Sequence, residues 1–241
     1  MYALKFYIGD DATGINTYTD WHLVPLSRPV VNPPSPKTNI IDIPGANGSI
    51  DLTESLNNYV VYNNRSGSWD FMVLNDRVPA ITWDNLYSNI MAYLHGQHGK
   101  VYLLEDDCWE NEQNPLPNEY YYEGRFSVNE WNSGDRYSRV TISYDLAPFQ
   151  FKKESTTESK IATAGGTNYT LTTGRMPVIP TFTASGNSDP IDIGFKGKHF
   201  SLPVGTKTFP DIIFGTNVSG TDIINLKGSG NVSISFRGGK L

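Results

Sequence analysis

The sequence predicts a mainly β protein of two domains with a single α-helix. With 241 residues, the chain has room for one or two domains with a real hydrophobic core. Its 22 Gly, 15 Pro and charged fraction of only 18% are typical of many strands joined by turns. The hydrophobic fraction is 38%, but the 12% of aromatic residues compensate for it because each ring buries a large area.

The charge and the aromatic content change sharply near Ala147-Pro148. Residues 1–147 carry 9 Lys+Arg and 19 Asp+Glu, a net charge of −10, whereas residues 148–241 carry 10 and 6, a net charge of +4. All five Trp and every Tyr except Tyr169 lie in the first part. We therefore expect two domains, residues 1–147 and residues 148–241.

The helix is expected just after residue 82. Apolar side chains recur there at helical spacing, at Trp83, Leu86, Tyr87, Ile90 and Leu94. Thr82 can cap the amino end, Asp84 lies in the first turn, and Gly96 follows the last periodic residue as a stop. The pattern predicts that Leu86, Ile90 and Leu94 are buried.

Strands of the first domain are expected at residues 2–8, 39–43, 69–74, 100–104, 119–131 and 137–146. The last of these alternates well, with Val140, Ile142, Tyr144 and Leu146 on one face. Asn132-Ser-Gly134 is typical of a hairpin turn before it. The four prolines between Pro29 and Pro36 indicate an extended loop.

The second domain is expected to be a β-sandwich without a helix. Seven short strands recur between turn signals, at residues 168–173, 178–184, 191–195, 198–202, 208–214, 222–226 and 231–236. Ser185-Gly-Asn187 and Gly228-Ser-Gly230 are two of the turns that separate them.

The sequence offers no convincing catalytic or metal-binding constellation. Glu105-Asp106-Asp107 could bind Ca²⁺, but it lacks the Gly and the distal Glu of a calcium loop, so a solvated turn is the favoured interpretation. His95 and His98 have a zinc-like spacing without further ligands, so a structural role is the simpler interpretation. Glu119 and Glu123 share one face of an expected strand, and paired carboxylates are typical of glycosidases, but no other catalytic residues accompany them. We expect no catalytic residue, no cofactor and no metal.

Two further features narrow the function classes. Cys108 is the single Cys, so an internal disulfide is excluded and an ordinary thiol is expected. No segment approaches the roughly 20 apolar residues that span a bilayer. No basic stretch followed by an apolar run opens the sequence, so we expect no signal peptide. We expect no membrane partner.

A series of residue sets occurs in order along the chain. They are Asp51-Leu-Thr-Glu54, Gly67-Ser-Trp69-Asp-Phe71, Leu94-His-Gly96, Lys100 to Asp107, Tyr121-Tyr-Glu-Gly124-Arg125, Tyr144-Asp-Leu-Ala-Pro148-Phe149 and Ser235-Phe-Arg237-Gly238-Gly-Lys-Leu241. Their order and spacing resemble the distal tail protein (Dit) family of long-tailed, non-contractile bacteriophages and prophages. The signature positions are Trp69, Trp83, Leu94, Gly96, Lys100, Gly124, Arg125, Tyr144, Pro148, Arg237 and Gly238.

The resemblance implies a fold and a role. It implies a tail-tube-like β-sandwich or split barrel with one α-helix, followed by a galectin-like β-sandwich. It also implies a homohexameric ring that joins the tail-tube protein to the trimeric tail-associated tip protein and supports receptor-binding components. Such a ring is assembled in the bacterial host cytoplasm, lies at the virion tail tip and lets DNA pass without binding it. The charge of −10 on the first domain would suit a channel for DNA, but it is equally an ordinary solvated surface.

Two other function classes stay open. A galectin-like fold invites a stand-alone carbohydrate-binding adhesion module, although residues 148–241 contain no Trp and one Tyr to stack on a sugar. A tail-tube subunit is the third interpretation, but such a subunit seldom needs a second sandwich.

Overall fold

The computed structural model describes residues 2–74, 83–104, 119–133, 137–186 and 189–241. The chain forms two compact units, Met1–Gln150 and Phe151–Leu241, and each is described by itself. The described residues are mainly β, with a single helix, which confirms the predicted fold class. No helix among them is long and apolar enough to cross a membrane.

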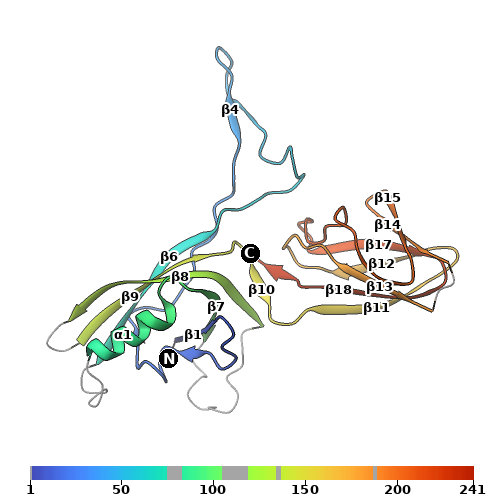
Figure 1. The fold of residues 1–241 in the computed structure, drawn as a ribbon. Coiled ribbons are helices and arrows are strands. Elements are labelled where there is room, and N and C mark those ends of the chain that lie inside the picture. Colours follow the sequence, from blue (N-terminus) through green and yellow to red (C-terminus); the bar gives the residue numbers. More distant parts are fainter. Residues whose placement is uncertain (1, 75–82, 105–118, 134–136, 187–188) are drawn as a thin grey trace. The chain divides into compact units, whose positions relative to one another are not determined.

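The first unit is built on one antiparallel sheet with the strand order β2-β1-β7-β8-β9-β6-β3 (Figure 1). Its strands are β1 (Ala3–Ile8), β2 (Ile15–Asn16), β3 (Val24–Pro25), β6 (Arg65–Leu74), β7 (His98–Leu104), β8 (Tyr120–Ser133) and β9 (Tyr137–Leu146). The long pairing of β6 with β9 runs from Arg65 opposite Leu146 to Leu74 opposite Tyr137.

This sheet curls back on itself around its core. The strands β1 and β6 are separated by three others in the sheet order, yet the Phe6 ring lies 6.3 Å from the Trp69 ring and 5.0 Å from the Phe126 ring. Opposite parts of the sheet therefore face each other across one layer of buried side chains. This is the arrangement expected of a sandwich or an open barrel.

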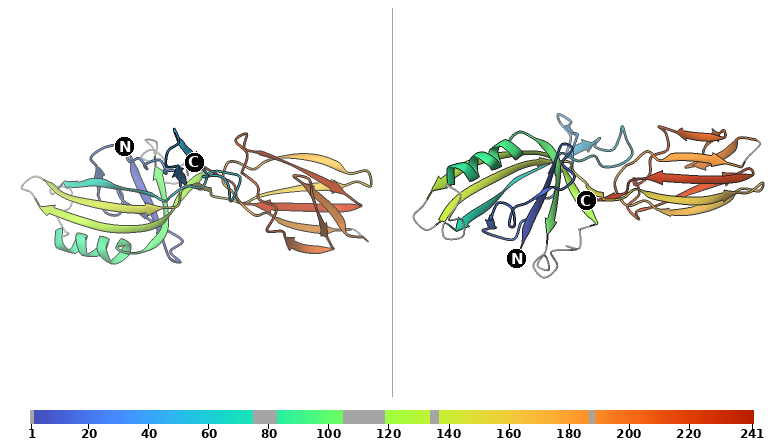
Figure 2. Two further views of the ribbon diagram at one scale, coloured as in Figure 1. Left: turned by 90° about the horizontal axis from the view of Figure 1, so that it is seen from above. Right: turned by 60° about the horizontal axis from the view of Figure 1, so that its bottom comes forward.

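The helix α1 (Trp83–Leu94) covers one face of this sheet (Figure 2). Leu86, Ile90 and Leu94 are buried in the core of the first unit, as the apolar spacing predicted. Gly96 adopts φ +73°, the left-handed conformation that ends a helix at little cost only for glycine. Thr82, the predicted cap, lies outside the described residues.

The strand predictions for the first unit are confirmed in most places. The strand at residues 137–146 has the predicted bounds, and Val140, Ile142, Tyr144 and Leu146 are all buried. The strand expected at 69–74 is wrong at its start, since β6 begins at Arg65, where polar residues and Gly67 hide the pattern. The predicted hairpin turn at Asn132-Ser-Gly134 lies partly outside the described residues.

The second unit is a β-sandwich of two four-stranded sheets, ordered β11-β18-β13-β16 and β12-β17-β14-β15 (Figure 2). The strands are β11 (Thr156–Ala162), β12 (Thr167–Thr172), β13 (Thr181–Ser185), β14 (Ile191–Phe195), β15 (Lys198–Leu202), β16 (Gly205–Thr208), β17 (Thr221–Lys227) and β18 (Gly230–Phe236). Their alternate side chains form one core that includes Phe182, Ile193, Ile224 and Ile234. The short strands β10 (Gln150–Lys152) and β19 (Gly239–Lys240) pair with each other.

Two predictions for this unit are wrong. Residues 209–214 are not a strand: Phe209, Ile212 and Phe214 instead turn inward and fill the core, and the strand β16 precedes them. The strand β11 was missed, because its sequence Thr-Thr-Glu-Ser-Lys-Ile-Ala is mostly polar. It is held in place by complete pairing with β18, from Thr156 opposite Phe236 to Ala162 opposite Gly230.

The two units should fold independently. We expect residues 1–150 and residues 151–241 each to unfold cooperatively, because each has its own core.

A fragment ending at the predicted boundary, residue 147, should be less stable than 1–150, because it lacks the Pro148 carbonyl that accepts a hydrogen bond from the Arg65 Nε at 2.8 Å. Urea unfolding of the three fragments measures this, and equal midpoints for 1–147 and 1–150 would contradict it.

Candidate functional site

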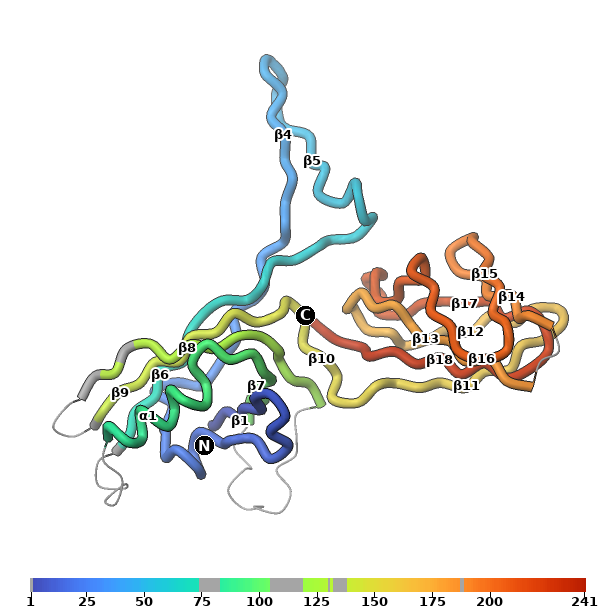
Figure 3. Tube along the Cα trace, viewed as in Figure 1, coloured from blue at the N-terminus to red at the C-terminus, as the bar shows by residue number. Residues whose placement is uncertain are grey.

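Residues 37–62, here called the arm, leave the sheet of the first unit before β6 and return to it (Figures 1 and 3). The base is closed by two hydrogen bonds, from the Lys37 amide to the Val61 carbonyl and from the Asn63 amide to the Ser35 carbonyl, both 2.8 Å. Within the arm, β4 (Ile40–Asp42) and β5 (Ser49–Asp51) form a separate two-stranded ribbon. Every residue from 37 to 58 except Thr53 is exposed.

The register of this ribbon separates its side chains into two faces. Ile41 pairs with Ile50, and alternation along the strands brings Ile43 and Leu52 to the same side. We call these four side chains the apolar face of the arm. On the other face, Ile40 pairs with Asp51, and Asp42 pairs with Ser49.

The acidic side of the arm is fixed by local hydrogen bonds. The carboxylate of Asp51 accepts the Thr53 amide at 2.9 Å and also the Thr53 hydroxyl. These bonds hold the pKa of Asp51 below its usual value, so the carboxylate stays ionised. The tip of the arm turns at Gly45 and Gly48, which adopt φ +82° and +83°.

Nothing in the described chain covers the apolar face. Its side chains are 47% (Ile41), 42% (Ile43), 48% (Ile50) and 36% (Leu52) exposed. A two-stranded ribbon alone is marginal in water, so the uncovered apolar face is a candidate assembly surface. Covering it would contribute about 3–5 kcal/mol, given roughly 1.5–3 kcal/mol per fully buried aliphatic side chain.

A second exposed apolar surface lies at the β3 edge of the sheet, on residues 26–30, here called the edge segment. The Leu26 amide donates to the Asp70 carbonyl at 2.9 Å, and the Val30 carbonyl accepts the Trp69 Nε1 at 2.9 Å. Leu26 is 40% exposed and Val30 is 60% exposed. Between them, the guanidinium of Arg28 lies 5.2 Å from the centre of the Tyr2 ring.

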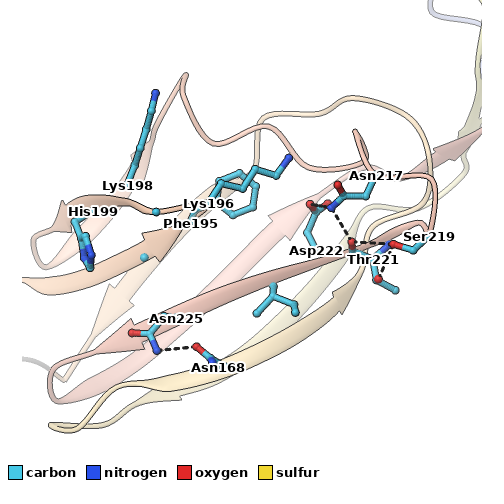
Figure 4. A pocket seen from close by; sticks show the side chains of 13 residues that line it. Asn168, Phe195, Lys196, Lys198, His199, Asn217, Ser219, Thr221, Asp222 and Asn225 are labelled. Atoms are coloured by element: carbon cyan, nitrogen blue, oxygen red, sulfur yellow. Dashed lines mark hydrogen bonds between the residues drawn. The ribbon is translucent and has the colours of Figure 1, made fainter. Parts of the chain in front are cut away.

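In the second unit, a polar hollow of about 630 Å³ lies over the sheet of β12, β17, β14 and β15 (Figure 4). Gly194 forms part of its lining, where a Cβ would approach the Cβ of Asn225 to 3.2 Å. The Asn225 amide donates to the Asn168 side-chain oxygen at 2.8 Å. On another side, the His199 Nδ1 lies 2.8 Å from a carboxylate oxygen of Asp192.

The hollow offers amide groups but no exposed Phe, Tyr or Trp ring. Phe195 is the one such residue in its lining; it is only 5% exposed, and the Lys196 ammonium lies 5.1 Å from the ring centre. The nearby Asp222 is buried and accepts hydrogen bonds from the Gly215 amide at 2.7 Å, from Thr173 and from Asn217. That carboxylate is therefore a structural group rather than a free acid or base.

The predicted signature positions of the first unit lie at different places rather than in one site. The Trp69 and Tyr144 rings pack 4.3 Å apart in the core, and the Tyr144 hydroxyl accepts the Asn32 amide at 3.1 Å. Burial raises the pKa of Tyr144. Trp83 begins α1 and packs against Trp131 at 5.1 Å, and Leu94 ends the helix in the core.

Two other signature residues, Gly96 and Arg125, meet where the helix returns to the sheet. The Arg125 Nη1 donates to the Gly96 carbonyl at 2.8 Å, and the Gly96 amide donates to the Phe126 carbonyl at 2.8 Å. At Gly124, a Cβ would lie 2.2 Å from the Asp145 carbonyl oxygen, so only glycine fits between the strands. The ammonium of Lys100 lies 5.1 Å from the Tyr121 ring centre.

Three signature residues remain. Pro148 lies close to the end of the first unit, and Arg237 and Gly238 lie in the second unit. The carbonyl of Gly238 accepts the Lys152 amide at 2.9 Å, and a Cβ on Gly238 would lie 3.2 Å from the Thr173 carbonyl oxygen. Arg237 is exposed. The carbonyl of Pro148 accepts a hydrogen bond from Arg65, which the sequence interpretation missed.

Arg65 organises the end of the first unit. Only 4% of the residue is exposed. Its Nη1 donates a hydrogen bond to the Asn32 carbonyl at 3.1 Å, and its guanidinium lies 5.5 Å from the centre of the Tyr122 ring. Burial lowers its pKa. An arginine after two asparagines is an ordinary surface pattern, so nothing in the sequence signals this role.

The candidate chemical residues do not assemble into a site. In the part of the chain that the structure describes, no group of three His, Cys, Asp or Glu could hold a metal ion. The His95 Nδ1 accepts the Val128 amide at 3.2 Å, which is a structural contact, and Glu123 lies opposite Lys100 on the neighbouring strand. Glu105-Asp106-Asp107 and Cys108 lie outside the described residues.

The fold defines a class of protein: a curled sheet with one helix and a projecting arm, followed by a β-sandwich. The solved structure of the SPP1 Dit (gp 19.1) protein is similar in fold, with a TM-score of 0.58 and 14% sequence identity over 100% of both chains. That protein is described as a paradigm of the hub adsorption apparatus in Gram-positive infecting phages. No family model and no curated protein matches the chain.

Proposed function

We propose that this chain is the distal tail protein of a phage or prophage tail tip, a structural hub rather than an enzyme. The observation that carries the proposal is the likeness to SPP1 Dit over the whole length of both chains. In this role, residues 1–147 form a homohexameric, tail-tube-like ring, and the galectin-like residues 148–241 support receptor-binding components. The ring joins the tail-tube protein to the trimeric tail-associated tip protein.

Two properties of the described residues support this role. The apolar face of the arm needs a protein partner, as expected of a subunit that functions only in an assembly. The side chains at the signature positions build the fold instead of meeting in one reactive pocket. A scaffold requires these properties, whereas an enzyme requires a converging set of reactive groups.

Immunogold labelling of induced virions tests the hub role. Antibodies against the purified chain should mark the distal tip of the tail, with about one site per particle. Labelling along the tail would identify a tube subunit, and the absence of the chain from virions would overturn the proposal.

DNA should pass the ring without being retained. Phosphate affinity depends on clustered Lys and Arg, whereas residues 1–147 have a net charge of −10. We expect no measurable binding of single- or double-stranded DNA at physiological salt by fluorescence anisotropy. Submicromolar binding that weakens steeply with salt would contradict the acidic-channel interpretation.

A carbohydrate-binding adhesion module is the alternative function, and the polar hollow is the observation that favours it. The paired amides of Asn168 and Asn225 could exchange hydrogen bonds with sugar hydroxyls, beside Ile223, which is 60% exposed. The hollow lacks an exposed Phe, Tyr or Trp ring to stack on a sugar, which disfavours this function. A glycan array with the full chain separates the two: specific binding that is lost in Gly194→Val would establish the adhesion module.

A further inference from the structure

We propose that the polar hollow of the second unit binds a saccharide or polyol that carries an acidic group, a phosphate or a carboxylate. A row of amides holds the hydroxyls of this ligand, and Lys196 holds its acidic group. The inference goes beyond the proposed hub function, because it gives the chain a ligand of its own that does not depend on the number of subunits in the assembly.

The amides stand in a row that crosses the outer face of one sheet. In the strand register, Asn168 lies opposite Asn225, Asn225 lies opposite Gly194, and Gly194 lies opposite His199. Residues directly opposite each other on neighbouring strands share a face, so these four positions form one line across the sheet. The hydrogen bond of 2.8 Å between the two amides uses one group of each, and each keeps its second group for a ligand.

Gly194 forms the floor of the hollow between the amides and the imidazole. A Cβ there would lie 3.2 Å from the Asn225 Cβ and 3.8 Å from the His199 Cε1, so any larger residue would fill the space. The hollow of about 630 Å³ falls within the roughly 300–1,000 Å³ of small-molecule sites. Because a carboxylate accepts hydrogen bonds, the His199 Nδ1 that faces Asp192 carries a proton, and Nε2 is left to contact a ligand.

Lys196 brings a positive charge to the rim of the hollow (Figure 4). Its Nζ donates to the Thr216 hydroxyl at 2.7 Å and lies 5.1 Å from the centre of the Phe195 ring, so neutral groups position it. No carboxylate of the described residues forms an ion pair with it. The one carboxylate of the lining, Asp222, is buried and already accepts several hydrogen bonds. The ammonium therefore remains available to an anionic group.

The backbone at Lys196 is a second, independent observation. Lys196 and Gly197 adopt φ +47° and +78° in the two-residue turn between β14 and β15. Turns with positive φ at both central positions favour Asn, Asp or Gly, and a positive φ is uncommon for lysine. Strained residues of this kind cluster at ligand sites, so the turn favours a role for the lysine side chain.

The two halves of the hollow together define the ligand class. A neutral sugar, which the adhesion alternative requires, leaves the cation unused and finds no exposed Phe, Tyr or Trp ring to stack on. An inorganic anion leaves the amide row unused. An acidic sugar uses both, and because the hollow is open to solvent we expect a dissociation constant on the order of 1 mM. Binding this weak is measured in solution rather than on a washed glycan array.

Saturation-transfer NMR of the full chain with glucose 6-phosphate, glucuronic acid and glucose tests the ligand class, with inorganic phosphate as competitor. We expect an acidic sugar to bind at least about tenfold more tightly than glucose or inorganic phosphate. Binding of only one acidic sugar supports the inference and identifies the acidic group as phosphate or carboxylate. Equal binding of glucose, displacement by inorganic phosphate as effective as by glucose 6-phosphate, or no binding would overturn it.

Three variants test the residues. Lys196→Asn removes the charge and places Asn where a positive φ favours it, so urea unfolding should match the parent while the affinity for acidic sugars falls about tenfold. Lys207→Asn makes the same change of net charge at an exposed position on the other sheet and should bind as the parent. Asn168→Ala should weaken acidic sugars without altering displacement by inorganic phosphate. Parent-like binding by Lys196→Asn, or an equal loss in Lys207→Asn, would overturn the inference.

Assembly is measured on the same samples, which separates this inference from the hub function. A six-fold ring that binds no acidic sugar would overturn the inference and leave the hub intact. Binding that depends on Lys196, in a chain that forms no ring, would support the inference and overturn the hexameric hub.

Discussion

Replacing Ile90 by alanine should destabilise the first unit by about 2–5 kcal/mol. Ile90 lies in the middle of α1, is fully buried and belongs to the core that the helix shares with the sheet. Truncation removes the transfer free energy of three carbon atoms and leaves a cavity that the surrounding strands cannot fill. The loss would be a large fraction of the 5–15 kcal/mol typical of a whole domain.

Urea unfolding of the full chain or of residues 1–150 measures this effect. Asn89→Ala, the neighbouring exposed position on the same helix, is the matched control and should change the stability little. If Ile90→Ala unfolds at the same denaturant concentration as the parent, the packing of the helix on the sheet is wrong.

Replacing Arg65 by alanine should cost about 2–4 kcal/mol, because two backbone carbonyls lose their donor. The carbonyls of Pro148 and Asn32 accept hydrogen bonds of 2.8 and 3.1 Å from this guanidinium. The guanidinium also packs over the Tyr122 ring, and that contact is lost too.

Two further variants separate these contributions. Arg65→Met keeps most of the packing and removes the donors, so it should recover only part of the lost stability. Arg139→Ala, an exposed arginine on the neighbouring strand β9, should stay within about 0.5 kcal/mol of the parent. Equal stability of Arg65→Ala and the parent in urea unfolding would show that these hydrogen bonds do not hold the end of the unit.

The sequence predicted those elements whose periodicity is set by a single buried face. The helix at 83–94 and the strand at 137–146 have such faces, and both appear as expected. The strand β11 could not be found in this way, because its position depends on backbone pairing with β18 rather than on an apolar pattern. The apolar run at 208–214 misled the interpretation, since its side chains enter the core from turns.

The candidate site was not predicted from the sequence, although the strand expected at 39–43 matches β4. The alternation of Ile41 with Ile43 and of Ile50 with Leu52 is a signal that one face of this segment is apolar. The same pattern would suit a strand of the main sheet, so the sequence cannot show that the arm projects uncovered. The role of Arg65 was hidden because its acceptors, Asn32 and Pro148, lie 33 and 83 residues away in the chain.

Negative-stain electron microscopy of the purified full chain, with mass measurement of the same sample, tests the hub role most directly. The proposed ring contains six copies of a 26.8 kDa chain. Top views should show six-fold symmetry around a central channel, and the measured mass should be six times that of the chain. A monomer at high concentration, or a closed assembly with another number of subunits, would contradict the hexameric hub.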